Sequence, residues 1–230
     1  QTEMENGLVR LAFNEFGEII SYRTADGREL AAGPLNRLTL YQDPLMIPFN
    51  AWDINPNYTK MPARRLRARK VTTKIEGPCV VREQTYRFGK SELVQRVVLE
   101  AGSDCVRFET QVNWHERLRM LRADFDPADF GDEAEFDIQF GAMKRATTER
   151  NSIETAQFEV CGHKWASVHR DGRGFALLND SKYGHRVKNG RMSLNLLRAP
   201  VYPNKTADRG EHAFSYAICP LGEDNARAVE

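Results

Sequence analysis

Apolar and polar residues alternate along most of the chain, which is the pattern of strands with one buried face. Turn signals such as Asn189-Gly190 separate the alternating segments. The only segment close to a helix, Ser152–Ala156, is short. Many short strands joined by such turns predict an all-β sandwich or barrel. The clearest predicted strands are residues 8–13, 19–22, 67–75, 80–88, 93–99, 106–114, 158–160, 165–169, 175–178, 192–197 and 213–219.

Two stretches do not fit a strand. The first, Tyr41–Met61, combines large aromatic residues with prolines, which cannot donate to a sheet ladder. The second, Arg198–His212, is also rich in proline and turn residues. Because long irregular loops in compact domains are uncommon and often functional, we expect the site at these two loops. The prolines concerned are Pro44, Pro48, Pro56, Pro62, Pro200 and Pro203.

Composition narrows the class of protein without naming a function. The 230 residues are 41% hydrophobic and 28% charged, as in ordinary globular proteins, and no repeat or linker divides them. We therefore expect one β-sandwich domain over residues 1–230. The net charge of +1 argues against a nucleic-acid partner, and the basic run Lys60–Lys70 is expected to form a solvated face or an interface. No apolar run is long enough to cross a membrane.

The number and spacing of the cysteines indicate the cellular compartment of the protein. Cys79, Cys105, Cys161 and Cys219 lie far apart and show no paired spacing. This usage favours buried reduced thiols over a disulfide framework or a zinc knuckle. No secretion signal is visible. We therefore expect a cytoplasmic protein.

Three polar groupings suggest chemistry but favour structural roles. The acidic residues between Asp124 and Asp137 do not have the spacing of a calcium loop, and we expect a solvated loop anchored by interleaved phenylalanines. His115 and Glu116 are adjacent on a predicted strand, so their side chains should point to opposite faces. No pair of histidines has metal-ligand spacing. We therefore predict no catalytic residue and no metal site in this chain.

Several segments occur together in a recognisable order. With them, the chain resembles the C-terminal region of family-38 glycoside hydrolases, the α-mannosidases, in their cytosolic and bacterial branch. The segments are Pro34–Leu38, Ala51–Asp53, Asn113–Arg117, Phe140-Gly141 with Lys144-Arg145, Glu159–Trp165, Gly174–Gly184, Leu194–Pro200 and Ala207–Phe214.

The resemblance implies a galactose-mutarotase-like supersandwich, a large antiparallel β-sandwich. It also implies a longer enzyme that hydrolyses α-mannosidic bonds with retention, using an aspartate nucleophile and an acid carboxyl in an N-terminal barrel that this chain lacks. Zinc would be bound in that catalytic domain, and this chain would hold no cofactor. The expected partners are the N-terminal catalytic domain and an α-mannoside or oligosaccharide. A homo-oligomer of the full-length enzyme is left open.

The resemblance places four substrate-binding candidates on the two loops. Arg198 and Asp208 would lie near the sugar, because an arginine fork can bind two oxygens at once; the alternative is an internal Arg–Asp ion pair. Trp52 and Asp53 would hold a pyranose by stacking and hydrogen bonding. Their alternative is a buried indole with Asp53 capping turn amides. Asn50 stands where relatives usually carry aspartate.

Two other functions remain open at the level of sequence. A free-standing mutarotase or epimerase would need a histidine and a glutamate converging in a cleft. A carbohydrate-binding module would use Trp52 and Tyr58 as its platform.

Overall fold

The computed structural model describes residues 2–44 and 49–222, so Pro48 of the first loop lies outside the described residues. The chain folds almost entirely as strands, with one short α-helix, α1 (Ser152–Ala156), and a 3-10 turn, η1 (Tyr58–Lys60). The strands are β1 (Glu3–Glu5), β2 (Val9–Phe13), β3 (Ile19–Thr24), β4 (Arg37–Gln42), β5 (Arg64–Arg65), β6 (Lys70–Glu76), β7 (Cys79–Phe88), β8 (Ser91–Glu100), β9 (Val106–Trp114), β10 (Arg119–Phe125), β11 (Glu133–Ile138), β12 (Gly141–Ala146), β13 (Val160–Cys161), β14 (Trp165–Arg170), β15 (Arg173–Asn179), β16 (Gly184–Lys188), β17 (Arg191–Arg198) and β18 (Gly210–Leu221).

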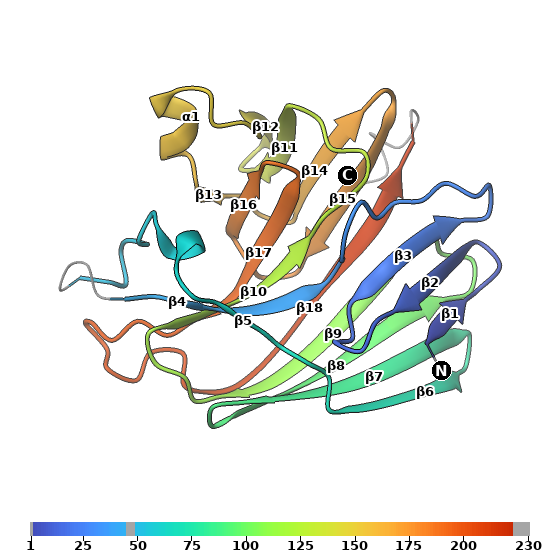
Figure 1. Cartoon of the computed structure of the whole chain (residues 1–230), viewed down its shortest axis with the longest axis horizontal. Coiled ribbons are helices and arrows are strands. Elements are labelled where there is room, and N and C mark those ends of the chain that lie inside the picture. Colours follow the sequence, from blue (N-terminus) through green and yellow to red (C-terminus); the bar gives the residue numbers. More distant parts are fainter. Residues whose placement is uncertain (1, 45–48, 223–230) are drawn as a thin grey trace.

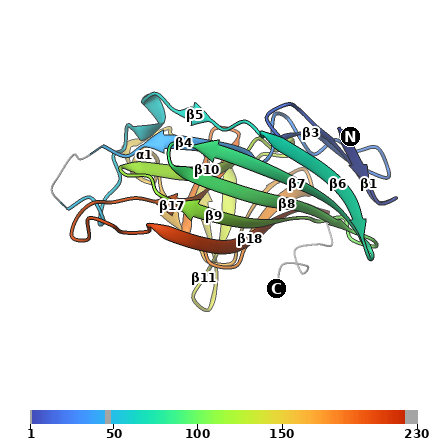
Figure 2. The same ribbon diagram turned by 90° about the horizontal axis from the view of Figure 1, so that it is seen from below.

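The described strands form two large antiparallel sheets and a small one (Figures 1 and 2). The large sheets have the orders β12-β11-β14-β15-β18-β9-β8-β7-β6 and β13-β16-β17-β10-β4-β5, and β1-β2-β3 form the third. Neighbours in sequence often pair through hairpins, whereas β9 pairs with β18 and β10 pairs with both β4 and β17. The prediction of an all-β antiparallel sandwich is confirmed.

The core lies between the inner faces of the two large sheets. From the larger sheet, β9 contributes Phe108 and β18 contributes Tyr216, whose rings stack with centroids 4.9 Å apart. From the smaller sheet, β10 contributes Phe125, which lies 6.4 Å from Phe108. All three side chains are almost fully excluded from solvent. Burial of each such ring stabilises the fold by about 1.5–3 kcal/mol relative to exposure.

Alternation located the strands that have one solvated face. The predicted strand 106–114 coincides with β9, whose residues alternate between buried and exposed or half-buried positions. The short segment Ser152–Ala156 is α1, and Asn151 caps it by accepting a hydrogen bond from the Glu154 amide. Strands β1, β4, β5, β10, β11, β12 and β16 were not predicted.

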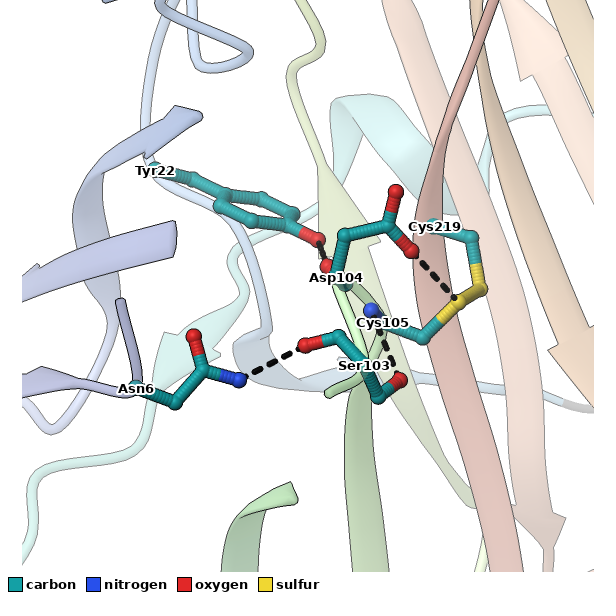
Figure 3. Close-up of a disulfide and its surroundings, with 6 residues drawn as sticks. All are labelled: Asn6, Tyr22, Ser103, Asp104, Cys105 and Cys219. Atoms are coloured by element: carbon teal, nitrogen blue, oxygen red, sulfur yellow. Dashed lines mark hydrogen bonds between the residues drawn. A yellow bond between two sulfur atoms is a disulfide. The ribbon is translucent and has the colours of Figure 1, made fainter. Parts of the chain in front are cut away.

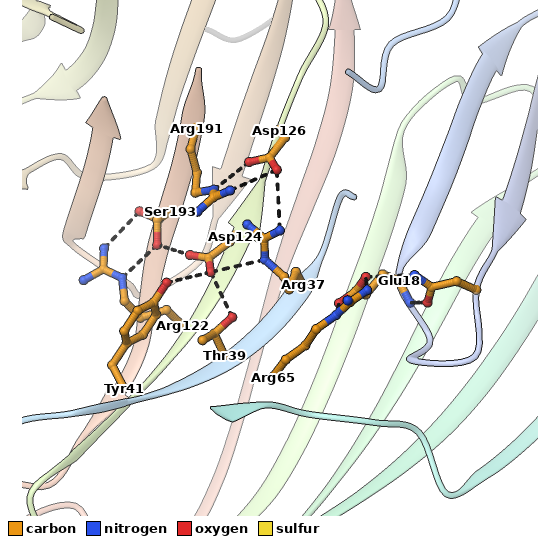
Figure 4. Close-up of polar contacts among 11 residues, drawn as sticks. Glu18, Arg37, Thr39, Tyr41, Arg65, Arg122, Asp124, Asp126, Arg191 and Ser193 are labelled. Atoms are coloured by element: carbon orange, nitrogen blue, oxygen red, sulfur yellow. Dashed lines mark hydrogen bonds and ion pairs between the residues drawn. The ribbon is translucent and has the colours of Figure 1, made fainter. Parts of the chain in front are cut away.

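The acidic segment that begins at Asp124 fits the expectation of a solvated loop only in part, because Asp132, between β10 and β11, is exposed but Asp124 is not. Asp124 lies in β10 and is 1% exposed, because both faces of this strand are covered. Its carboxylate accepts hydrogen bonds from Thr39, Tyr41 and Ser193 at 2.9, 3.1 and 2.6 Å (Figure 4). The interleaved Phe125 is buried as expected.

The basic run Lys60–Lys70 does not form one regular strand. Arg64 and Arg65 form β5 and Lys70 begins β6, whereas the residues between them lie outside strands. Arg65 forms an ion pair with the buried Glu18 (Figure 4). It also lies over the Phe16 ring, 3.8 Å from its centroid. Arg67 pairs with Glu15 at 2.5 Å. These contacts attach the segment between β5 and β6 to the turn between β2 and β3.

Two of the cysteines form a disulfide, so the expectation of four reduced thiols was wrong. Cys105 immediately precedes β9 and Cys219 lies in β18; the pairing of these strands places the two residues opposite each other, although 114 positions separate them. The adjoining turn is held by Asn6, whose amide donates to the Ser103 carbonyl at 2.7 Å, and by Tyr22, whose hydroxyl donates to the Asp104 carbonyl (Figure 3). Cys79 is half-buried and Cys161 is exposed.

This pairing predicts two reactive thiols and two protected ones. Alkylation of the denatured, unreduced chain should add two groups, on Cys79 and Cys161, whereas alkylation after reduction should add four. Intact-mass spectrometry with peptide mapping measures both. Four adducts without reduction would contradict the disulfide.

No helix in the described part of the chain is long and apolar enough to span a membrane.

Candidate functional site

The two irregular loops chosen from the sequence lie at the same end of the molecule, at the left of Figure 1. Asn50 joins them, because its side-chain oxygen accepts hydrogen bonds from the amides of Val201 and Tyr202, each at 3.2 Å. Asn50 is 3% exposed. A buried side chain therefore links the first loop to the second, and they form one structural unit.

Arg198, the last residue of β17, is held at the base of this unit. Its guanidinium makes a two-pronged ion pair with Asp43, with N–O distances of 2.7 and 3.0 Å, and also donates to the Asp53 carbonyl. The Asp43 side chain is 1% exposed and that of Arg198 is 13% exposed. Such a paired fork holds the arginine in one orientation. The internal ion pair considered for Arg198 is present, but its partner is Asp43, which the sequence reasoning missed.

Asp208 does not join this pair. It lies on the second loop in the left-handed backbone region, with φ of 59°, and its side chain is exposed. Its carbonyl oxygen is 2.7 Å from a ring nitrogen of His212. Asp208 instead lies near Lys182. The charges of Asp180 and Asp208 raise the pKa of Lys182, but burial has the larger effect and lowers it overall. The structure thus brings Arg198, Trp52 and Asp53 together and leaves Asp208 beside a different cation.

Trp52 belongs to an exposed aromatic cluster that spans both loops. Its indole centroid lies 6.0 Å from that of Phe49 and 6.3 Å from that of Tyr202. Trp52 is 69% exposed, so the alternative of a buried indole is wrong. Asp53 accepts a hydrogen bond from the Ile54 amide at 2.8 Å, which is the turn-capping role considered for it.

A buried polar layer lies between this end and the core. Arg122 of β10 is completely buried, and its guanidinium is 3.0 Å from the Glu159 carboxylate. The Tyr58 hydroxyl donates to the same carboxylate, and Tyr58 is 1% exposed. Tyr58 therefore cannot act as a stacking platform. Burial, reinforced by the Asp124 charge, raises the pKa of Tyr41 to about 12, so this layer carries neutral phenols at physiological pH.

His115 and Glu116 do not form an acid–base pair at this site. Strand β9 ends at Trp114, so both residues lie in the following turn. Glu116 accepts hydrogen bonds from the Ser91 hydroxyl at 2.8 Å and the Lys90 amide at 3.3 Å. The His115 side chain is exposed. Glu116 thus stabilises the turn between β7 and β8.

The described residues contain no group of three or more histidine, cysteine, aspartate or glutamate side chains placed to hold a metal ion. His169 and Asp171 have the His-x-Asp spacing of a metal-ligand pair, but His169 lies in β14 and Asp171 in the turn that follows it. The His169 ring is 3.0 Å from the Ser167 hydroxyl.

The fold also occurs in solved structures of carbohydrate-active proteins. The structure superposes on an α-mannosidase from Enterococcus faecalis V583 with a TM-score of 0.82 and 16% identity, covering 98% of this chain and 30% of that one. It also superposes on a Klebsiella pneumoniae protein assigned as an aldose 1-epimerase, with a TM-score of 0.51 and 9% identity, covering 96% and 79% of the two chains. These likenesses establish a shared, mutarotase-like sandwich fold.

The sequence identifies the family. Residues 4–206 match the profile described as "Glycosyl hydrolases family 38 C-terminal domain". The chain is 35% identical over 229 residues to human Alpha-mannosidase 2C1, covering 94% of this chain. It therefore belongs to the family of C-terminal domains of family-38 glycoside hydrolases. It spans only 21% of the length of that relative.

Proposed function

We propose that this chain forms the C-terminal β-sandwich of a longer retaining α-mannosidase and completes the wall of its substrate site. The observation that carries this proposal is the joined pair of loops, in which Asp43 orients Arg198 beside the backbone of Trp52 and Asp53. Family membership supports the assignment to an α-mannosidase. The exposed aromatic cluster supports contact with a sugar or with the catalytic domain.

In this proposal, the catalytic carboxylates and a zinc ion belong to a preceding catalytic domain. That domain would carry out the two-carboxylate reaction of retaining glycosidases on an α-mannoside or oligosaccharide. Arg198 would bind sugar oxygens or a neighbouring carboxylate through Nη1, the guanidinium nitrogen that its bonds to Asp43 and Asp53 do not use. Trp52 would cover the apolar face of a pyranose. Asp53 would position the loop through its carbonyl bond to Arg198. Asp208 stays a candidate only for the outer part of the site, because it is exposed and its charge acts on Lys182.

A cytoplasmic location is also proposed, on the strength of the family resemblance. The cysteine argument for it no longer holds, because Cys105 and Cys219 form a disulfide and such bonds are uncommon in reducing compartments.

Replacing Trp52 by alanine in the full-length enzyme tests the role of the loops. We expect kcat/KM for an aryl α-mannoside to fall about tenfold, which corresponds to about 1.4 kcal/mol of transition-state stabilisation. The temperature midpoint of unfolding should change little, because the indole is 69% exposed. Steady-state kinetics and thermal unfolding provide the two measurements.

Ile75→Ala is the matched control, because Ile75 is 80% exposed on β6, away from the loops. A second variant, Arg198→Lys, keeps the positive charge but loses the two-pronged geometry. Unchanged kcat/KM in both Trp52→Ala and Arg198→Lys would remove these loops from the proposed role.

A further inference from the structure

A second cleft is lined by β11, the start of β12, the segment before β14 and the end of β15, and none of its lining residues belongs to the two loops. It has a volume of about 510 Å³, within the range of small-molecule sites. Its lining includes Phe140, at the turn between β11 and β12, and Tyr183, in the segment between β15 and β16. The hairpin that begins with β11 projects from the body of the molecule (Figure 2).

The backbone around this cleft is cross-linked by hydrogen bonds. Asp137 of β11 accepts from the His163 amide through its carbonyl oxygen at 2.9 Å and from the Lys164 amide through one carboxylate oxygen at 2.8 Å. Asn179 donates to the His163 carbonyl at 2.8 Å from its side chain. The Gly162 amide donates to the Tyr183 carbonyl at 3.1 Å. Three segments distant in sequence are thereby held in one arrangement before any ligand binds.

Several polar groups in the cleft are not used by this scaffold. Within the described chain, no partner is assigned to the second carboxylate oxygen of Asp137, the Lys164 ammonium group, the Tyr183 hydroxyl or the ring nitrogens of His163. The Asp137 oxygen is a hydrogen-bond acceptor and the Lys164 ammonium group is a cationic donor, whereas the Tyr183 hydroxyl and the His163 ring can each donate or accept. The cleft lining holds two carboxylates, Asp137 and Asp180. They are offset by the Lys164 ammonium group and by that of Lys182, which interacts with the Asp180 charge. This balance favours an uncharged ligand rich in hydroxyl groups.

Two aromatic side chains supply apolar surface beside these groups. Tyr183 is 56% exposed and packs edge-on against the His163 ring, with centroids 5.4 Å apart. Phe140 is fully exposed and has a φ of 61°, an uncommon backbone conformation for a bulky residue. This φ belongs to the two-residue turn that joins β11 to β12 and leaves the ring exposed. The aromatic rings match the apolar face of a pyranose, and the free polar groups match its hydroxyls.

We propose that this cleft is an auxiliary binding site for a neutral hexopyranoside, separate from the loops assigned to the substrate wall. Tyr183 and Phe140 contact the sugar ring, and Asp137, His163 and Lys164 bind its hydroxyls. Three segments that carry the family resemblance meet in this cleft. They contain Phe140-Gly141, Glu159–Trp165 and Gly174–Gly184. The site does not depend on the proposed function of the two loops.

Titration of the ¹⁵N-labelled 230-residue chain with methyl α-D-mannopyranoside tests this site. We expect saturable shifts of the amide signals of His163, Lys164 and Tyr183 at millimolar ligand. Tyr183→Ala and Phe140→Ala should each weaken binding at least tenfold while leaving the remaining spectrum dispersed, because both side chains are exposed. Sorbitol, which has the hydroxyls but no ring, should produce no saturable shift.

Trp52→Ala separates this proposal from the preceding one. Binding that survives in Trp52→Ala and is lost in Tyr183→Ala supports the auxiliary site, whatever happens to turnover in the full-length enzyme. Binding lost only in Trp52→Ala would place the sugar at the loops and overturn the proposal. Three further results would also overturn it. The first is the absence of amide shifts at methyl α-D-mannopyranoside concentrations up to about 50 times a dissociation constant of about 1 mM. The others are equal shifts with sorbitol, or unchanged affinity in both Tyr183→Ala and Phe140→Ala.

Discussion

Replacing Arg122 by alanine should lower the free energy of unfolding by about 3–5 kcal/mol, the usual result of removing one partner of a buried ion pair. Arg122 is completely buried, and its guanidinium lies 3.0 Å from Glu159. It also donates to the side chain and the carbonyl of Ser193, at 2.8 and 3.2 Å. The variant would leave Glu159, whose side chain is only 12% exposed, without its cation.

Urea unfolding, followed by tryptophan fluorescence and circular dichroism, measures this change. The matched control is Arg10→Ala, because Arg10 pairs with Glu3 at 2.5 Å but both side chains are at least half exposed. Exposed pairs contribute about 0–1 kcal/mol, so this variant should be close to wild type. Loss of the folded state in Arg122→Ala would agree with the prediction. A loss below about 1 kcal/mol would mean that Glu159 finds another partner or water.

The second large effect concerns acid stability and depends on His185. This side chain of β16 is fully buried, and its two ring nitrogens have no hydrogen-bond partner among the residues described. Burial, reinforced by the nearby charges of Arg122 and Arg145, lowers the pKa of His185 to about 3. In the unfolded chain the ring should titrate near its ordinary pKa of about 6.5. Between these two values, only the unfolded state binds the proton.

Stability should therefore decrease as the pH falls from about 6.5 towards 3. The slope from this residue is about 1.4 kcal/mol per pH unit, so by pH 4.5 the loss is about 2–3 kcal/mol. His185→Gln should remove this component, and its free energy of unfolding should fall less than that of wild type between pH 7.5 and 4.5. Urea titrations at several pH values measure the difference.

The control for this effect is His115→Gln, because the His115 side chain is exposed. It should follow the wild-type dependence on pH, including the part that arises from carboxylates. Parallel curves for wild type and His185→Gln would show that the buried ring contributes nothing to acid denaturation.

The candidate site was predictable in part. Proline-rich composition located both loops, and the motif resemblance selected Trp52, Asp53 and Arg198, which the structure brings together. Asp43 was missed, because nothing in its immediate sequence distinguishes a buried anchor from a turn carboxylate. The cleft near Tyr183 was also missed as a site. Its lining comes from three segments, and its free groups can be recognised only once the backbone hydrogen bonds are known.

The strands divide in a similar way. In β9, polar residues face solvent and apolar residues face the core, so alternation along the chain reveals the strand. In β10, both faces are covered, and Arg122 and Asp124 are buried beside Leu121 and Phe125. A strand of this kind shows no alternation, and its charged residues are easily mistaken for a surface loop.

The sequence by itself determined the all-β class, most of the strands and the family, because alternation and motif order are properties of contiguous residues. Only the tertiary structure decided which distant residues meet. Arg198 pairs with Asp43 across 155 positions, and Cys105 pairs with Cys219 across 114. These pairings depend on the order of strands within each sheet and on the register between them. Both are set by packing of the whole core, because a shift of one residue would turn every side chain of a strand to the opposite face.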